Sequence, residues 1–154
     1  MKYTDTLIGF QEFPDEITLC INISNCPYHC KGCHSPHLWE DVGTELNTLE
    51  LDRLIKANEG ITCVGFMGGE PRIVNAMAAI VKYCYGLKSG WYTGLSSLPE
   101  NVDKHNFDYV KFGRYIEELG GLDNPRTNQR MFKIEGDNLL DITHRFWKND
   151  GIRN

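Results

Sequence analysis

Apolar and polar residues follow one another along the chain in a pattern that predicts strands alternating with helices. Short runs of apolar and β-branched residues, bounded by turn residues, predict strands. Apolar residues at helical spacing, with a capping residue before and a glycine after, predict helices. Strands are expected at 17–23, 61–67, around 91–93, at 107–112 and at 131–134, and helices at 47–59 and 71–85. Such alternation predicts a parallel sheet with right-handed crossovers.

Chain length decides which parallel architecture is expected. A closed eight-unit barrel takes about 250 residues, and this chain has 154. We therefore predict an α/β fold, an open partial (βα) barrel with a mainly parallel sheet, as a single domain over residues 1–154. Residues 1–16 are polar and mixed, and they are predicted to be a lead-in with one short extended piece.

The densest chemistry lies in the loop that follows the first predicted strand. Cys26, Cys30 and Cys33 have the spacing C-x3-C-x2-C. Reduced cysteines clustered in this way indicate metal ligands. A four-iron cluster usually takes four thiolates, so three would leave one iron open to another ligand. A structural zinc site with three cysteines and one histidine is the alternative, and the histidines that could complete it are His29, His34 and His37.

A glycine-rich turn follows the second predicted strand. It reads Gly68-Gly69-Glu70-Pro71, with the proline at the first position of the next helix. The carboxyl ends of parallel strands meet at one rim of a sheet, so this turn and the cysteine loop are expected to lie together. Glycines allow a ligand to approach the backbone closely. Glu70 either contacts that ligand or only complements the helix dipole.

Composition and charge limit the other classes of function. The net charge of −5 argues against a nucleic-acid-binding surface. No stretch has the length of a membrane span, and the first residues contain no apolar export signal. A cytoplasmic location with reduced thiols is therefore expected. Three further cysteines lie in apolar segments and are predicted to be buried and structural: Cys20, Cys63 and Cys84. The alternative for Cys20 is a place near the metal site, where it would affect the site without being a ligand.

The cysteine spacing and the glycine turn together resemble the radical S-adenosylmethionine (SAM) superfamily. Within it, four features are similar to one branch, the anaerobic ribonucleoside-triphosphate reductase activating proteins. These are Gly32 before the third cysteine, Trp39 six residues after it, and the segments Trp91-Tyr92-Thr93-Gly94 and Asn128-Gln129-Arg130. Many members of the superfamily instead have an aromatic residue at the position of Gly32.

The resemblance implies a cofactor set and a reaction. Cys26, Cys30 and Cys33 would hold a [4Fe–4S] cluster, and SAM would chelate the fourth iron. One electron would cleave SAM to methionine and a 5′-deoxyadenosyl radical. That radical would take hydrogen from a glycine Cα of the partner, the anaerobic ribonucleoside-triphosphate reductase. An electron donor such as a flavodoxin-type reductant is also implied, and no nucleic acid or membrane is.

The resemblance also implies residues that contact SAM. They are Gly32, Cys33, His34, Gly68, Gly69, Glu70 and Thr93. Alternatives stand beside three of the assignments: His34 as a solvent-facing loop residue, Thr93 as a packing residue, and Glu70 as a helix-capping group.

Two further readings of the function stay open at this point. A second kind of activase, for a glycyl-radical enzyme of the formate-lyase type, fits the same motifs but is usually longer. The alternative from another class is a zinc-binding interaction module without enzymatic activity. Residues 113–130 carry candidates for contact with a partner, although an ordinary solvated loop would have the same composition: Arg114, Glu117, Glu118, Arg126 and Arg130.

Overall fold

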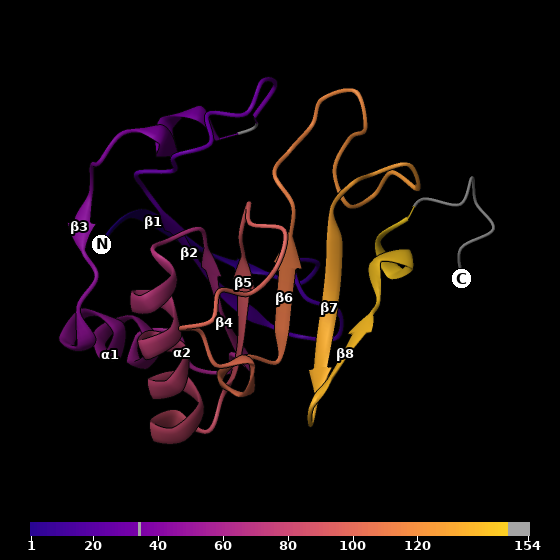
Figure 1. The fold of residues 1–154 in the computed structure, drawn as a ribbon. Helices are drawn as coiled ribbons and strands as arrows, with labels where there is room; N and C mark the ends of the chain where they lie inside the picture. The colour runs from indigo at the N-terminus through magenta and orange to yellow at the C-terminus, as the bar shows by residue number, and fades with distance from the viewer. Residues whose placement is uncertain (34, 148–154) are drawn as a thin grey trace.

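One mixed β-sheet runs through the whole protein (Figure 1). The computed structural model describes residues 1–33 and 35–147. The strands in it are β1 (Lys2–Gly9), β2 (Thr18–Ile23), β3 (Thr44–Glu45), β4 (Cys63–Met67), β5 (Lys88–Tyr92), β6 (Tyr109–Phe112), β7 (Arg130–Glu135) and β8 (Asn138–Asp141). Their order across the sheet is β3-β1-β2-β4-β5-β6-β7-β8.

The predicted open partial (βα) barrel with a mainly parallel sheet is wrong. Only the central strands β2, β4, β5 and β6 are parallel to one another, whereas β1 and β3 on one side and β7 and β8 on the other pair antiparallel. The described residues contain only two α-helices, and the connection from β5 to β6 carries none. The supposed lead-in forms β1, an antiparallel strand in which most residues are partly or fully exposed.

Both α-helices form where the sequence predicts them. α1 (Thr48–Lys56) begins after Asn47, whose side chain accepts a hydrogen bond from the Glu50 N–H at 2.8 Å. α2 (Pro71–Tyr85) has proline in its first turn and ends at Gly86, which is left-handed at φ 65°. Short 3₁₀ turns complete the regular structure: η1 (Pro36–Trp39), η2 (Lys104–Asn106) and η3 (Thr143–Phe146). No helix within the described ranges combines the length and the apolar character needed to cross a bilayer.

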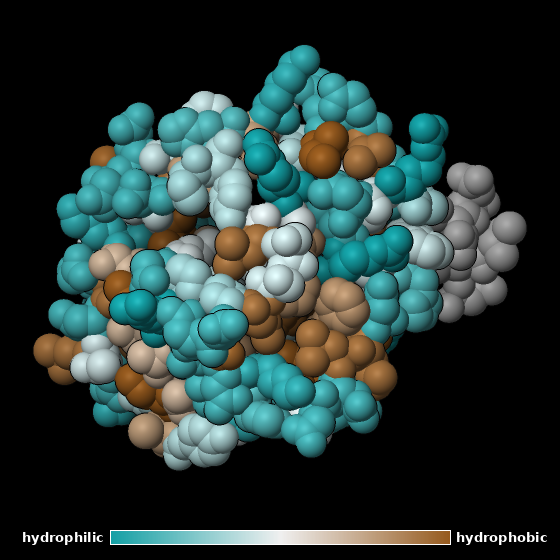
Figure 2. Space-filling model, viewed as in Figure 1, coloured by the Kyte–Doolittle hydropathy of each residue, from teal (hydrophilic) through white to brown (hydrophobic). Residues whose placement is uncertain are grey.

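The larger core lies between the helices and one face of the sheet. It contains Ile21, Val64, Phe66 and Trp91 from the central strands, and α2 packs on it through Val74 and its apolar neighbours. Figure 2 shows the surface of this side, where apolar side chains gather in the middle and hydrophilic ones surround them. The central strands are therefore held by burial, which fixes where their carboxyl ends lie.

A smaller core covers the opposite face of the sheet. Phe13, from the segment between β1 and β2, is fully buried and stacks on Tyr109 with ring centroids 5.2 Å apart. Its ring lies over Gly65 and Gly90, which are direct partners in neighbouring strands. A Cβ built on Gly90 would come within 2.3 Å of the Phe13 ring. Glycine at this position therefore makes the room for the aromatic ring.

Candidate metal centre

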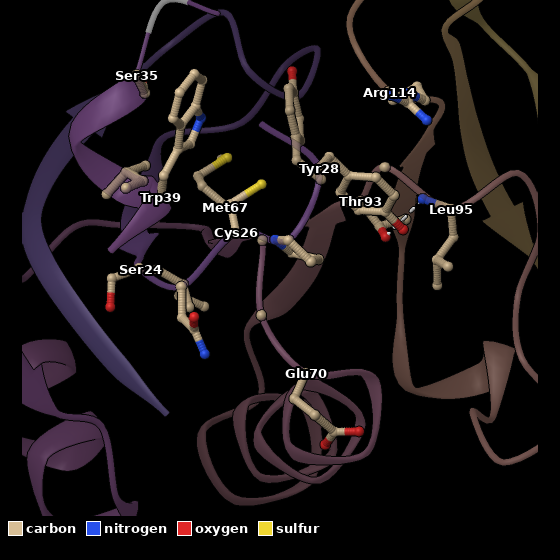
Figure 3. Close-up of a pocket in the computed structure, with 18 of the residues that line it drawn as sticks. Ser24, Cys26, Tyr28, Ser35, Trp39, Met67, Glu70, Thr93, Leu95 and Arg114 are labelled. Carbon is tan, nitrogen blue, oxygen red and sulfur yellow. Dashed lines mark hydrogen bonds between the residues drawn. The ribbon is translucent and has the colours of Figure 1, made fainter. Parts of the chain in front are cut away.

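A cavity of about 640 Å³ opens at the carboxyl ends of the parallel strands. Its volume lies in the range of small-molecule sites, roughly 300–1,000 Å³. The cysteine loop, the glycine turn after β4, and the ends of β5 and β6 all contribute to its wall (Figure 3). The predicted meeting of the two motifs at one rim is thus confirmed, because β2 and β4 are parallel neighbours.

All three cysteines of the C-x3-C-x2-C loop line this cavity. Cys26, Cys30 and Cys33 are free thiols of intermediate exposure. Backbone bonds shape the loop: the Cys26 N–H donates to the Leu38 carbonyl at 2.9 Å, and the Cys33 N–H to the Cys30 carbonyl at 3.1 Å. The Ser35 N–H donates to the Cys33 Sγ at 3.3 Å. These bonds shape the backbone of the loop along the wall of the cavity.

The loop also contains left-handed backbone. His29 has φ 47°, a conformation that costs a non-glycine residue free energy. Its ring stacks on Trp39, with centroids 4.6 Å apart and planes 11° from parallel. In residues 1–33 and 35–147, no three His, Cys, Asp or Glu side chains form a group that would hold a single metal ion. Whether a cluster fits this cavity therefore depends also on the other groups that line it.

One such group is Lys111, which the sequence analysis did not single out. Its side chain comes from β6, lines the cavity and is only 7% exposed. The ammonium donates to the Gly113 carbonyl at 2.9 Å and lies 5.4 Å from the centre of the Tyr92 ring. Burial lowers the pKa of Lys111 to about 8, and the nearby Cys30 and Cys26 thiols act in the opposite direction. Among the described residues, no carboxylate forms an ion pair with it.

A second such group is the indole N–H of Trp39. The nitrogen is buried and has no hydrogen-bond partner among the described residues, although the ring lines the cavity. A buried ammonium without a carboxylate and a buried N–H without an acceptor both favour an anionic, acceptor-rich group in this space. A cluster with thiolate and sulfide ligands has that character, so the walls fit the predicted cofactor.

The glycine turn places its backbone at the wall of the cavity. Gly68 and Gly69 have φ 101° and 108°, which only glycine adopts readily. The Gly68 N–H donates to the Tyr92 carbonyl at 2.9 Å, and the Gly68 carbonyl accepts from the Trp91 indole at 3.0 Å. A Cβ on Gly69 would lie 2.6 Å from the Val74 side chain. The turn is therefore rigid and brings bare backbone close to any ligand.

Glu70 lines the same cavity, but its carboxylate has a partner in the helix that follows. Its Oε2 accepts a hydrogen bond from the Ile73 N–H at 3.0 Å, which caps α2. In Figure 3, Glu70 lies at the start of this helix, apart from the cysteine loop. The capping role is thus present in the structure, and contact with SAM stays a prediction.

The remaining residues predicted to contact SAM do not all line the cavity. Thr93 is buried and lines the cavity, and its hydroxyl accepts from the Leu95 N–H at 3.2 Å. Its neighbour Trp91 is fully buried. Gly32 does not line the cavity: it has φ 75° and lies beside the Glu117 carboxylate. His34 lies outside the described residues.

The wall opposite the glycine turn joins the cysteine loop to the segment after β6. The Tyr28 ring lies against Gly94, where an added Cβ would come within 2.6 Å of it. The Arg114 guanidinium lies 5.9 Å from the centre of the same ring (Figure 3). Arg114, predicted as a partner contact, therefore belongs to the edge of the cavity.

The other three cysteines do not line the cavity. Cys20 and Cys63 are buried as predicted, and burial raises the pKa of both thiols, that of Cys20 to about 12. The prediction for Cys84 is wrong, because this residue is exposed on α2. Its position in an apolar stretch conceals that it faces away from the sheet.

Comparison with known proteins agrees with this chemistry. No solved structure matches the chain. The model of one family, described as a 4Fe-4S single cluster domain, matches residues 17–94. This range begins just before β2 and contains the three cysteines, the glycine turn and Thr93. The chain therefore belongs to the family of 4Fe-4S single cluster domains.

Proposed function

We propose that this protein is a radical-SAM oxidoreductase that activates the anaerobic ribonucleoside-triphosphate reductase. The observation that carries the proposal is the joint placement of three thiols and a buried, carboxylate-free Lys111 around one ligand-sized cavity. Three thiolates leave one iron of a cluster open, and the cavity beside that iron has room for a nucleoside-bearing ligand. The motifs around Gly32 and Trp39 favour the reductase activase over the formate-lyase type.

The residues of the wall would divide the work of binding. Cys26, Cys30 and Cys33 would hold the cluster, which when bound supplies the electron that cleaves SAM. Lys111 would pair with the carboxylate of SAM, because a buried ammonium gains most from an anionic partner. The backbone of Gly68 and Gly69 would lie against the ligand. The chain supplies placement and exclusion of water, and the cofactors supply the radical chemistry.

Hydrogen transfer from the reductase requires its glycine to reach this cavity. The segment after β6 borders the cavity through Arg114, so it is the surface where we place the partner. Reduction would come from an external one-electron donor of the flavodoxin type. The proposed reaction ends with 5′-deoxyadenosine and a glycyl radical on the reductase.

The first experiment measures iron, sulfide and zinc in protein purified without oxygen, followed by EPR after reduction. About four irons and four sulfides for each chain, with a signal that changes when SAM is added, would support the proposal. One zinc without sulfide, persisting after attempted cluster reconstitution, would refute it in favour of the zinc module. Cys30→Ala should lose the cluster and SAM cleavage, whereas Cys84→Ala, outside the cavity, should keep both.

The second experiment tests the partner. Reduced protein, SAM and the anaerobic reductase are mixed, and the glycyl-radical EPR signal of the reductase is recorded. Formation of that radical, with one 5′-deoxyadenosine released for each radical, supports the activase proposal. SAM cleavage with a radical on a formate-lyase-type enzyme, and none on the reductase, would assign the protein to the other kind of activase.

A further inference from the structure

The indole N–H of Trp39 is a hydrogen-bond donor that lacks an acceptor. Tryptophan only donates, and leaving such a donor buried and unpaired is unfavourable. The N–H of Trp91, in contrast, is satisfied by the Gly68 carbonyl at 3.0 Å. Trp147 also has a buried, unpartnered indole nitrogen, but it lies outside the cavity. Trp39 therefore joins two properties: a missing acceptor and a place in the cavity wall.

The position of the Trp39 ring is fixed from two sides. Trp39 is the last residue of η1, whose Leu38 carbonyl holds the Cys26 N–H. The ring stacks on His29 of the cysteine loop. Figure 3 shows its nitrogen on the side facing the hollow, toward the sulfur atoms drawn there. The orientation of the N–H is thus set by the same loop that carries the cysteines.

We propose that the Trp39 indole N–H donates a hydrogen bond to a sulfur atom of the iron–sulfur cluster. The acceptor is a cysteinyl sulfur or a bridging sulfide, the acceptors that a cluster on Cys26, Cys30 and Cys33 brings into this cavity. This inference rests on cluster binding, a part of the proposed function, but not on the identity of the protein partner. Hydrogen bonds to the sulfurs of a cluster set its reduction potential. This bond favours the reduced cluster, because the reduced form carries more negative charge for the N–H to stabilise.

The test observes the bond directly in the wild-type protein. Tryptophan is labelled with ¹⁵N in the indole ring, the cluster is reduced without SAM, and pulsed EPR detects magnetic coupling to nearby nuclei. We expect coupling to one indole ¹⁵N and to one exchangeable proton, both absent in Trp39→Phe and both kept in Trp147→Phe. Because wild-type protein carries the main measurement, the test holds even where a variant fails to fold.

The second readout is the reduction potential of the cluster. Trp39→Phe keeps the aromatic ring and removes the N–H, so the ratio of reduced to oxidised cluster at a fixed solution potential should fall by roughly three- to tenfold, where tenfold is about 59 mV. Trp147→Phe should leave this ratio unchanged.

Two outcomes would overturn the inference. One is the absence of indole coupling together with an unchanged potential in Trp39→Phe. The other is coupling that arises only after SAM is added, which would mean that the Trp39 N–H donates to SAM and not to the cluster. A wild-type protein that binds no iron and sulfide would instead fail at the proposed function, and metal analysis before the EPR experiment separates that case.

Discussion

Replacing Lys111 by methionine is expected to stabilise the metal-free protein while weakening its binding of SAM. Methionine has a similar length and no charge, so it fills the space of the lysine stem. Lys111 is 7% exposed, and its ammonium has no carboxylate partner in the described part of the chain. Stability and ligand binding should therefore change in opposite directions, as expected where a charge is retained for function.

The magnitude follows from the pKa of this lysine. Burial lowers the pKa of Lys111 from 10.5 to about 8, and each unit corresponds to about 1.36 kcal/mol, so the buried charge costs on the order of 3 kcal/mol. Methionine loses the hydrogen bond to the Gly113 carbonyl, worth roughly 0.5–1.5 kcal/mol. That carbonyl keeps the Gln129 side-chain amide as a donor at 3.3 Å. A net stabilisation of about 2 kcal/mol at neutral pH remains.

The destabilisation caused by the buried Lys111 charge should depend on pH. Below pH 8 the lysine is protonated in both the native and the unfolded state, and the full penalty is present. Between about 8 and 10.5 only the unfolded chain holds the proton, so the stability of the wild type rises with pH. The advantage of Lys111→Met is therefore largest at neutral pH and disappears toward pH 10.5.

Urea denaturation at a series of pH values measures the difference between wild type and variant. Lys133→Met is the matched control, because Lys133 lies in the neighbouring strand with its side chain 40% exposed, and its effect should stay within about 0.5 kcal/mol. A lower stability of Lys111→Met at neutral pH, or a pH dependence equal to that of the wild type, would refute the reasoning. In the loaded protein, loss of a charge-assisted bond should weaken SAM binding about 10- to 150-fold.

Two further predictions concern stability away from the cavity. Gly90→Ala should lower the free energy of unfolding by about 1–3 kcal/mol, because its Cβ would come within 2.3 Å of the buried Phe13 ring. Gly121→Ala is the control, because its Cβ would come no closer than 3.8 Å to a neighbouring atom, and equal denaturation midpoints for the two variants would contradict the clash. The pKa of His105 is raised by its hydrogen bond with Asp137, so its stabilising effect should be present below pH 6.5 and be lost as pH rises through the higher native pKa. His105→Gln should remove this part of the pH dependence in thermal unfolding, and an unchanged pH profile would argue against the pair.

Sequence patterns predicted the central part of the fold and missed its flanks. The parallel strands have dense apolar runs, and α2 has proline at its start and glycine at its end, so burial and capping both act locally. β1 is half-exposed and polar, and every residue of β8 is exposed. Strands of this kind are stabilised by pairing with a neighbour rather than by their own composition, and pairing is not visible in one sequence. The predicted barrel failed for this reason.

The candidate site was predictable where a motif carried the chemistry. The cysteine spacing and the glycine turn led to one rim because the carboxyl ends of parallel strands meet there. Lys111 had a signal that was not used: it is the one charged residue of the apolar strand Tyr109–Phe112. No sequence signal could have shown that the Trp39 N–H lacks an acceptor, because this depends on which atoms surround the ring in three dimensions.

Three unfavourable local features occur in or beside this cavity. An ammonium is buried without a carboxylate, an indole N–H has no acceptor, and His29 holds a left-handed backbone. Each costs on the order of 1–3 kcal/mol, and a marginally stable domain retains such costs mainly where function requires them. A bound group that is anionic and rich in acceptors would compensate the first two together. Loading the cluster together with SAM should therefore raise the unfolding temperature, and by less in Lys111→Met, where one of the two compensated groups is gone.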